Sequence, residues 1–292
     1  MISIKKLTFF SILILFGLTL EANAFKPKVF KATAIRVLSY NIRYKNTIDS
    51  INGWEYRKDK VVGLIKYHNA DLIGMQEAEF SQVRDLELML PDFAWYGVGR
   101  IDGKEKGESC AIFYRKSRLK LLDSGTFWLS EEPNIIGTKS WDSFFPRVAS
   151  WGKFKDLHTG KIFFHFNTHY DHRGEIARQK SSELLVKKVN SLAGNLPVFV
   201  TGDFNTINTS IAYKNIVENT SLFDAHFISK EPHYGPKGTS SGFLVKGNVD
   251  RKIDYIFVNS QISVIKHAVL SEQQEGRYYS DHLPVIIEAL FR

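Results

Sequence analysis

Short runs of apolar and β-branched residues recur along the chain and predict strands. These runs lie at 35–42, 71–76, 148–155, 161–168, 196–201, 253–258 and 284–290. Apolar residues at helical spacing predict helices over 57–69, 80–90 and 174–192. Two further runs, 109–114 and 119–122, predict a hairpin around the charged segment 115–118. Strands interleaved with a few helices predict an α/β (α+β) fold, in which two packed sheets are covered by helices.

The N-terminus has the pattern of an export signal. Lys5 and Lys6 precede an uncharged, mostly apolar run at 7–20, and Ala22-Asn23-Ala24 is an A-x-A cleavage site. The run is shorter than the roughly 20 residues that span a bilayer, and an uncleaved membrane anchor is the alternative interpretation. We therefore expect a signal peptide over 1–24 and export to the periplasm or the extracellular space, with no stable membrane span in the mature form.

Composition narrows the picture only in part. No internal repeat, low-complexity stretch or Pro/Ser-rich linker divides the rest of the chain, so we expect one domain over 25–292, which we take to be monomeric. The sole cysteine, Cys110, excludes an intramolecular disulfide, so the core must hold the fold. A formal net charge of +8 favours anionic partners, namely phosphate esters, nucleic acid or acidic glycans, without choosing among them.

Polar clusters stand at the ends of the apolar runs. They are Ser39-Tyr40-Asn41, Gln76-Glu77, the segment 167–172, Gly202-Asp203-Phe204-Asn205, Arg251-Lys252-Ile253-Asp254 and Ser280-Asp281-His282. Strand ends are where loops present chemistry from a rigid scaffold, so the clusters together predict a site. Taken singly, each cluster is also what an ordinary turn beside a strand looks like. The glycine- and serine-rich segment 235–247 predicts a surface loop beside this site.

Carboxylates in these clusters suggest a metal. Glu77 ends a buried strand, where a carboxylate is costly unless it is paired or bound to a cation, and Asp281 can hold a divalent metal while His282 contacts a substrate oxygen. Asn41 could orient Glu77 or ligate the metal through its amide oxygen. Hard oxygen donors suit Mg²⁺, with Mn²⁺ as the alternative ion. Zinc is disfavoured because the sequence has no cysteine cluster and because the acid- and amide-rich set suits Mg²⁺ better. The alternatives are a helix-capping Glu77 and a turn residue at Asn41.

Other residues of the clusters predict proton transfer. Asp203 and Asn205 point the same way from an extended segment, which provides a base for a water and an amide to hold it, although Gly-Asp-x-Asn also makes an Asx-turn. Asp254 lies inside an apolar strand and needs a partner. His282 is a natural one, with Arg251 or Lys252 as the alternative.

Substrate contacts are predicted for Asp171, Arg147 and Arg57, and His169 is a further candidate for phosphate contact or proton transfer. His169 ends a strand and has Asp171 close by, which makes phosphate contact or proton transfer credible, whereas a lone histidine there is usually a core residue. Arg147 could fork onto a phosphate, or else be a solvated edge residue. Arg57 and Trp54 could form a substrate wall, or else Trp54 covers the core.

Together, the ordered motifs resemble the endonuclease/exonuclease/phosphatase superfamily, which includes deoxyribonuclease I, AP endonucleases, sphingomyelinases and inositol polyphosphate 5-phosphatases. The set runs Asn, Gln-Glu, Thr-His, Gly-Asp-x-Asn, Ile-Asp-Tyr and Ser-Asp-His between Val37 and Ile286. The resemblance implies a four-layer α/β sandwich of two packed mixed sheets flanked by helices. Segments 40–44 and 54–57 resemble the uncharacterised bacterial branch of the superfamily.

The resemblance also implies roles. Asn41, Glu77 and Asp281 would lie at the metal, and Asp203 with Asn205 would place or activate the attacking water. His282, oriented by Asp254, would contact the scissile phosphate, and His169 would match the second histidine of deoxyribonuclease-like members. The implied mechanism is in-line attack of a metal-positioned water on phosphorus.

We therefore expect an exported Mg²⁺-dependent phosphoesterase acting on a small or lipid-like phosphodiester or phosphomonoester. An extracellular nuclease acting on DNA or RNA is the alternative. A non-catalytic phosphate- or glycan-binding module on the same fold is a third hypothesis. The intact set of acids, amides and histidines argues against this third hypothesis, because a binding module has no need of all of them.

Overall fold

A computed structural model describes residues 33–292 with the exception of 219 and 246–248. The expected signal peptide, 1–24, lies outside the described residues. Among the helices that are described, none combines the length and apolar character that a membrane crossing requires.

Two mixed sheets of six strands each form the centre of the molecule. The first sheet has the order β11 (Ile262–Val269), β14 (Val285–Phe291), β1 (Ile35–Asn41), β2 (Leu72–Gln76), β4 (Ile112–Arg115) and β3 (Phe93–Tyr96). The second has the order β5 (Leu119–Trp128), β6 (Val148–Asp156), β7 (Ile162–His169), β8 (Val198–Asp203), β10 (Asp254–Asn259) and β9 (Leu222–Asp224).

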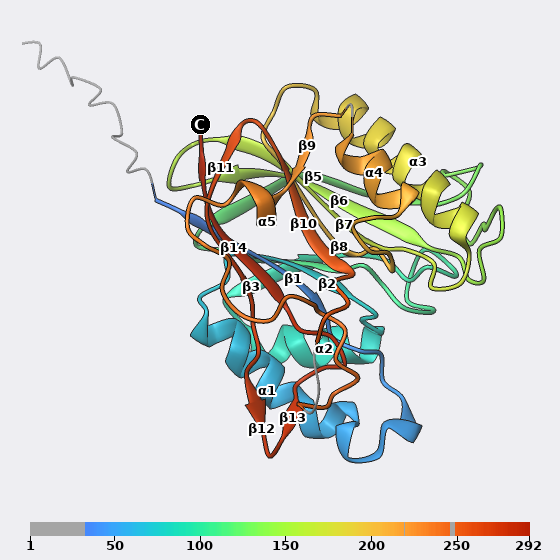
Figure 1. Ribbon diagram of the computed structural model, residues 1–292, viewed down its shortest axis with the longest axis vertical. Coiled ribbons are helices and arrows are strands. Elements are labelled where there is room, and N and C mark those ends of the chain that lie inside the picture. Colours follow the sequence, from blue (N-terminus) through green and yellow to red (C-terminus); the bar gives the residue numbers. More distant parts are fainter. Residues whose placement is uncertain (1–32, 219, 246–248) are drawn as a thin grey trace, which may run out of the picture.

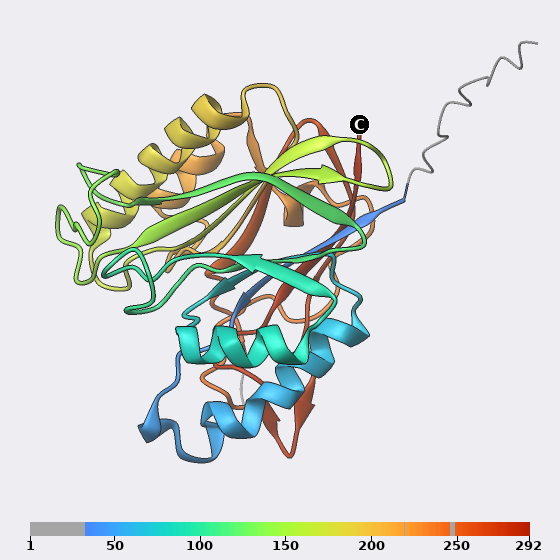
Figure 2. The same cartoon turned by 180° about the vertical axis from the view of Figure 1, so that it is seen from behind.

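Helices flank both sheets. The outer face of the first sheet is covered by α1 (Trp54–Tyr67) and α2 (Phe80–Met89), and that of the second by α3 (Glu175–Ala193) and α4 (Ile211–Val217) (Figure 1). The view from behind shows the same order of layers (Figure 2). The smaller elements are the 3-10 helix η1 (Thr47–Asn52), α5 (Ala225–Ile228), β12 (Gln273–Gln274) and β13 (Arg277–Tyr278). This arrangement confirms the predicted fold of two packed mixed sheets flanked by helices.

Alternation of side chains along the strands builds three apolar layers. Val37 of β1 points between the sheets, where it joins residues of the second sheet such as Phe199 and Ile256. Its neighbour Leu38 points the other way, into the layer under α1 and α2. Central strands are thus buried on both faces, which explains why they read as continuous apolar runs rather than as alternating ones.

Strand pairing brings the polar clusters to one edge. Within the first sheet β1 and β2 are parallel, with Asn41 opposite Gln76 at their ends. Within the second, β7 and β8 are parallel, with His169 opposite Asp203. Strand β10 is antiparallel to β8, so Asp254 at its start lies opposite Asp203. Sequence-distant side chains therefore meet where these strands end or begin.

The predicted hairpin of 109–114 and 119–122 is wrong. Strand β4 pairs with β2 and β3 in the first sheet, whereas β5 pairs with β6 in the second. The charged segment between them crosses from one sheet to the other, and Arg118 within it is buried and donates to Asp156 at 2.9 Å. Periodicity predicted most of the longer strands but not their pairing. It missed β3 and β11 as well as the short strands β9, β12 and β13.

Candidate active site

A pocket of about 500 Å³ opens where the strands of the two sheets end. Of the residues singled out from the sequence, its lining includes Glu77, Arg147, His169, Asp203, Asn205, Asp281 and His282. The described part of the loop predicted at 235–247 borders this site, because Ser240 forms a β-bridge with His282 and Ser241 N donates to the carbonyl of Asp281. The structure thus gathers most of the predicted site residues into one cavity.

His282 is held as a cation by buried carboxylates. Its Nδ1 lies 2.8 Å from Asp254 Oδ2 and 3.8 Å from Asp203 Oδ2. Burial by itself lowers the pKa of His282, but the charges of Asp254 and Asp203 outweigh it and raise the pKa well above 6.5. The pair predicted between Asp254 and His282 is present in the structure. It leaves Nε2 as the ring nitrogen that can serve the pocket.

Asp203 has the surroundings of a general base. Its Oδ2 accepts a hydrogen bond from Asn41 Nδ2 at 3.0 Å, and its Oδ1 accepts one from Asn205 N at 2.9 Å. Burial, and then repulsion from Asp254, raise the pKa of Asp203 to about 7. A carboxylate with a pKa near the working pH can both take and release a proton.

Asn205 and His169 hold each other in place. Asn205 Nδ2 donates to the carbonyl of Tyr170 at 3.1 Å and lies 3.0 Å from His169 Nε2. Because that amide nitrogen is a donor, Nε2 must be the acceptor and Nδ1 must carry the proton of the neutral ring. Burial, and then Arg147, keep the pKa of His169 well below 6.5. His169 therefore offers a neutral N–H rather than a charge, and Asn205 keeps its amide oxygen for the pocket.

The amide of Asn41 bridges the two sheets. Its Nδ2 donates to Glu77 Oε1 at 3.1 Å as well as to Asp203, while its Oδ1 accepts from Arg43 N at 3.0 Å. The backbone N–H of Arg43 can only donate, and this fixes which end of the amide faces which partner. Of the two roles predicted for Asn41, this geometry favours orienting Glu77 over ligating a metal.

Three non-glycine residues at the site have left-handed backbone. Arg43, Glu77 and Asn205 have φ of 59°, 60° and 49°. Such conformations each cost on the order of 1–3 kcal/mol and persist only where the surroundings enforce them, as at ligand sites. Here the strain turns the Glu77 and Asn205 side chains from the strand ends into the pocket.

The acidic donors fit a hard divalent cation. Glu77 forms a cluster with Asp203 and His169 whose ligand atoms all lie within 4.8 Å of one another. Asp281 lines the same pocket, and burial raises its pKa. Glu77 and Asp281 would hold Mg²⁺, which takes one or two carboxylates and keeps several waters. A cation there would supply positive charge toward a phosphate oxygen.

Arginines give the pocket its positive wall, and only one of them was predicted. Arg147 Nη2 lies 3.1 Å from His172 Nδ1. Its Nε and Nη1 form no hydrogen bond among the described residues, but they lie 3.6 Å from Asp171 Oδ2 and 3.8 Å from Glu108 Oε2. Arg100 and Arg43 also line the pocket, and Arg100 is paired with Glu108 at 2.8 Å. Neither Arg100 nor Glu108 lies in a motif, so no signal in the sequence points to them.

Asp171 does not contact the pocket, so the predicted substrate contact is wrong. It is 1% exposed and accepts hydrogen bonds from the backbone N–H groups of Phe144, Phe145, Arg173 and Gly174. Burial works against its charge, but these donors lower the pKa of Asp171 to about 2. The carboxylate instead ties the loop that carries Arg147 to the start of α3.

Arg57 is also absent from the pocket. Its Nη1 donates to the carbonyls of Ile42 at 2.8 Å and Tyr279 at 2.9 Å, and the side chain is buried against Trp54. The predicted substrate wall is therefore wrong, because backbone oxygens already take up the guanidinium. Arg57 fastens the two segments that follow β1 and precede Ser280.

Two packed mixed sheets with these acids, amides and histidines at one edge define a class of phosphoesterases. The model of the endonuclease/exonuclease/phosphatase family matches residues 38–282, so the chain belongs to this family. Members of the family hydrolyse phosphoester bonds and generally depend on a divalent metal.

Known proteins of several kinds are similar to the chain. A family member from Bacteroides vulgatus is 41% identical, with a TM-score of 0.85 over 89% of this chain and 100% of that one. The mannosyl-6-phosphatase of Bacteroides thetaiotaomicron is 38% identical, with a TM-score of 0.84 over 88% of this chain and 100% of that one. A probable CCR4-Not complex 3'-5'-exoribonuclease subunit of Encephalitozoon cuniculi is 24% identical over 64% of this chain and 44% of that protein.

Proposed function

We propose that the protein is an exported, divalent-metal-dependent phosphoesterase that hydrolyses a small phosphomonoester, with a phosphorylated sugar as the substrate class. The observation that carries the proposal is the buried Asp254–His282 pair beside Asp203, in a pocket with three arginines. A phosphomonoester carries between one and two negative charges at neutral pH, which suits such a wall. The likeness to a mannosyl-6-phosphatase supports the sugar phosphate.

The side chains divide the work by charge and position. Asp203 accepts the proton of the attacking water, because its pKa of about 7 allows it to be ionised and yet basic. His282, kept protonated by Asp254, stabilises the negative charge that develops on the phosphoryl group. Arg147, which lines the pocket, orients the phosphate before the attack.

His169 and the amides keep this geometry rigid. The neutral His169 donates from Nδ1, which bonds to no partner among the described residues. Asn205 holds His169 and directs its own amide oxygen to the water, while Asn41 fixes Asp203 relative to Glu77. Preorganised donors of this kind account for a large share of the rate in phosphoryl transfer.

A nuclease is the second candidate, and an exposed aromatic pair favours it. Phe144 and Phe145 stand at the edge of the site, with Arg173 4.0 Å above the ring of Phe144. Aromatic and guanidinium planes are the surfaces on which single-stranded bases stack. A nuclease reading requires turnover that falls steeply as salt rises, because phosphate contacts release counterions. Hydrolysis of a small ester does not require this.

The test of function is a substrate panel for the purified protein with and without Mg²⁺. It compares mannose 6-phosphate, p-nitrophenyl phosphate, bis-p-nitrophenyl phosphate and single-stranded RNA. We expect EDTA-sensitive phosphate release from the two monoesters to be faster than hydrolysis of the diester or the RNA. Faster, salt-sensitive RNA cleavage would favour the nuclease. Binding of phosphate without turnover of any compound would leave only the binding module.

Export has its own support and its own test. The basic start, apolar run and A-x-A site of residues 1–24 motivate it. Expression in a bacterial host followed by cell fractionation and intact-mass analysis should find a chain that begins at Phe25 outside the cytoplasm. A full-length chain retained in the membrane fraction would instead identify residues 1–24 as an anchor.

A further inference from the structure

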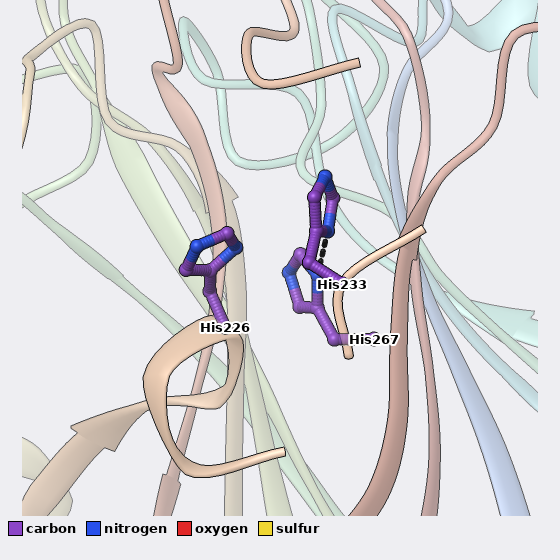
Figure 3. Close-up of side chains that lie close together, drawn as sticks. All are labelled: His226, His233 and His267. Carbon is purple, nitrogen blue, oxygen red and sulfur yellow. Dashed lines mark hydrogen bonds between the residues drawn. The ribbon is translucent and has the colours of Figure 1, made fainter. Parts of the chain in front are cut away.

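Three histidines meet in a part of the molecule that the phosphoester site does not use. His226 belongs to α5, His233 to the segment after it, and His267 to β11. Their rings lie close together, tilted or edge-on to one another, with centroids 4.8 Å apart for His226–His233 and 5.0 Å apart for both other pairs (Figure 3). Each ring offers a nitrogen, and these atoms all lie within 4.8 Å of one another.

Hydrogen bonding prepares one of the rings to donate a lone pair. His233 Nε2 lies 2.9 Å from the carbonyl oxygen of Pro236, which can only accept, so Nε2 carries the proton. The other nitrogen, Nδ1, is then free of hydrogen and accepts a hydrogen bond of 2.9 Å from His267 Nδ1, which leaves Nε2 as the unprotonated nitrogen of a neutral His267. A ring nitrogen oriented by an N–H···O=C bond on its far side is how protein histidines usually approach a metal.

The two other rings contain buried nitrogens without partners. His267 is 1% exposed, and its Nε2 bonds to no described residue. His226 Nδ1 is buried and unpaired in the same way. An unsatisfied buried polar atom costs about 1–3 kcal/mol, so two of them in one cluster call for a ligand.

The cluster opens on one side. A cavity of about 550 Å³ is lined by His226 and His233 together with Asp224 and Lys252. Asp224 is occupied by Lys252, whose Nζ lies 3.3 Å from Oδ2. A metal on three imidazoles would therefore keep its remaining position toward this cavity, for water or a small anion.

We propose that His226, His233 and His267 form a second cation site, which takes a borderline transition metal of the Zn²⁺ class and clamps α5 to β11. Imidazole donors without carboxylates select such ions over Mg²⁺. The acidic phosphoester pocket has the opposite preference. The two sites thus separate two kinds of metal by donor chemistry, and this inference holds whatever the substrate of the pocket.

The test is Zn²⁺ stoichiometry in the full chain, purified without a polyhistidine tag and stripped with EDTA. Zn²⁺ is titrated calorimetrically with millimolar Mg²⁺ present, and retained metal is counted by elemental analysis after gel filtration. We expect one retained Zn²⁺ per chain in the wild type. The same value is expected in Glu77→Gln/Asp203→Asn, which disables the acidic pocket, and in His158→Ala, which removes an exposed histidine.

Variants of the cluster should lose this metal. His226→Ala and His233→Ala alter half-buried side chains, so each should fold with an unchanged Tm before Zn²⁺ is added. Zn²⁺ at about 100 times its Kd should raise the Tm of the wild type by about 5 °C or more and leave both variants unmoved. Retention of Zn²⁺ by these two variants together with its loss from Glu77→Gln/Asp203→Asn, or no retained Zn²⁺ in the wild type, would overturn the proposal.

Discussion

At the scale of single residues, the charge of His282 is set by its neighbours rather than by its exposure. The ring is buried, which favours the neutral form, yet Asp254 at 2.8 Å and Asp203 at 3.8 Å keep it protonated. Because the cationic form is the one stabilised, it persists from low pH to well above 6.5. Loss of the imidazolium therefore lowers activity on the alkaline side of neutrality, whereas protonation of Asp203, whose pKa is about 7, lowers it on the acid side.

Replacing Asp254 should move that alkaline limit. In Asp254→Asn the stronger of the two attractive charges is removed, so the pKa of His282 falls and kcat/KM should be lost at a lower pH than in the wild type. The measurement is the pH profile of kcat/KM for a phosphomonoester. Asp250→Asn, at an exposed position, is the control and should keep the wild-type profile. If the alkaline limb of the pH profile is unchanged in Asp254→Asn, that limb does not report the deprotonation of His282.

Asp171 makes a prediction about stability. Its pKa is about 2 in the folded chain against roughly 3.9 in an unfolded one, so its ionisation contributes about 2.5 kcal/mol at neutral pH. Since the folded pKa is the lower one, this contribution is present above about pH 4 and is lost as the pH falls toward 2. Urea unfolding of Asp171→Asn should show a large deficit at pH 7 that shrinks by pH 3. If the loss of unfolding free energy in Asp171→Asn does not change with pH, the charge of Asp171 does not contribute to stability.

At the scale of elements, the site exists because strand ends of two sheets meet. Gly74 of β2 shows how closely the sheets approach, since a Cβ there would collide with Thr201 and Asn167 of the second sheet. Gln76 lies two residues further along β2, and its Nε2 donates to Asn167 Oδ1 at 2.6 Å. This buried contact fixes the distance between the sheets immediately beside Glu77.

Gly74→Ala should therefore destabilise the protein, by roughly 1–3 kcal/mol, because the sheets must separate to admit the methyl group. Gly63→Ala is the matched control. Gly63 lies on the exposed side of α1 with nothing near its would-be Cβ, so alanine should stabilise the helix by about 0.5–1 kcal/mol. Urea denaturation of both variants measures the change in the free energy of unfolding, which should be negative for Gly74→Ala and positive for Gly63→Ala. Equal effects would show that the inter-sheet contact is not restrictive.

Elements also show what the sequence could and could not predict. The strands ending at Asn41, Gln76, His169 and Asp203 were predictable, because central strands buried on both faces leave unbroken apolar runs. The polar clusters at their ends follow from the same pattern. The partners of β4 and β5, which lie in different sheets, could not be predicted, because a charged hairpin turn and a charged connection between two sheets have the same sequence pattern.

The sequence pattern could not predict the roles of residues that depend on their tertiary partners. Arg57 and Arg147 are both arginines near polar clusters, yet the guanidinium of Arg57 bonds to backbone carbonyls whereas Arg147 lines the pocket. Asp171 faces a loop rather than the pocket for the same kind of reason. Arg100 and Glu108 reach the site from a segment without any motif.

At the scale of the whole molecule, the donors fall into two chemically distinct groups. Carboxylates and amides gather at the edge shared by both sheets, and imidazoles gather between α5 and β11. The formal net charge of +8 adds attraction for anions around both. The proposed hydrolysis of a small anionic ester at His282 and Asp203 would benefit from this attraction.

The most direct measurement is therefore the turnover of a phosphomonoester by the wild type, His282→Ala and His158→Ala, each with Mg²⁺ and with EDTA. We expect EDTA-sensitive turnover for the wild type and His158→Ala. For His282→Ala we expect a kcat lower by roughly 10²–10⁴ with an unchanged circular dichroism spectrum. Wild-type kcat in a folded His282→Ala would contradict the claim that this pocket performs the chemistry.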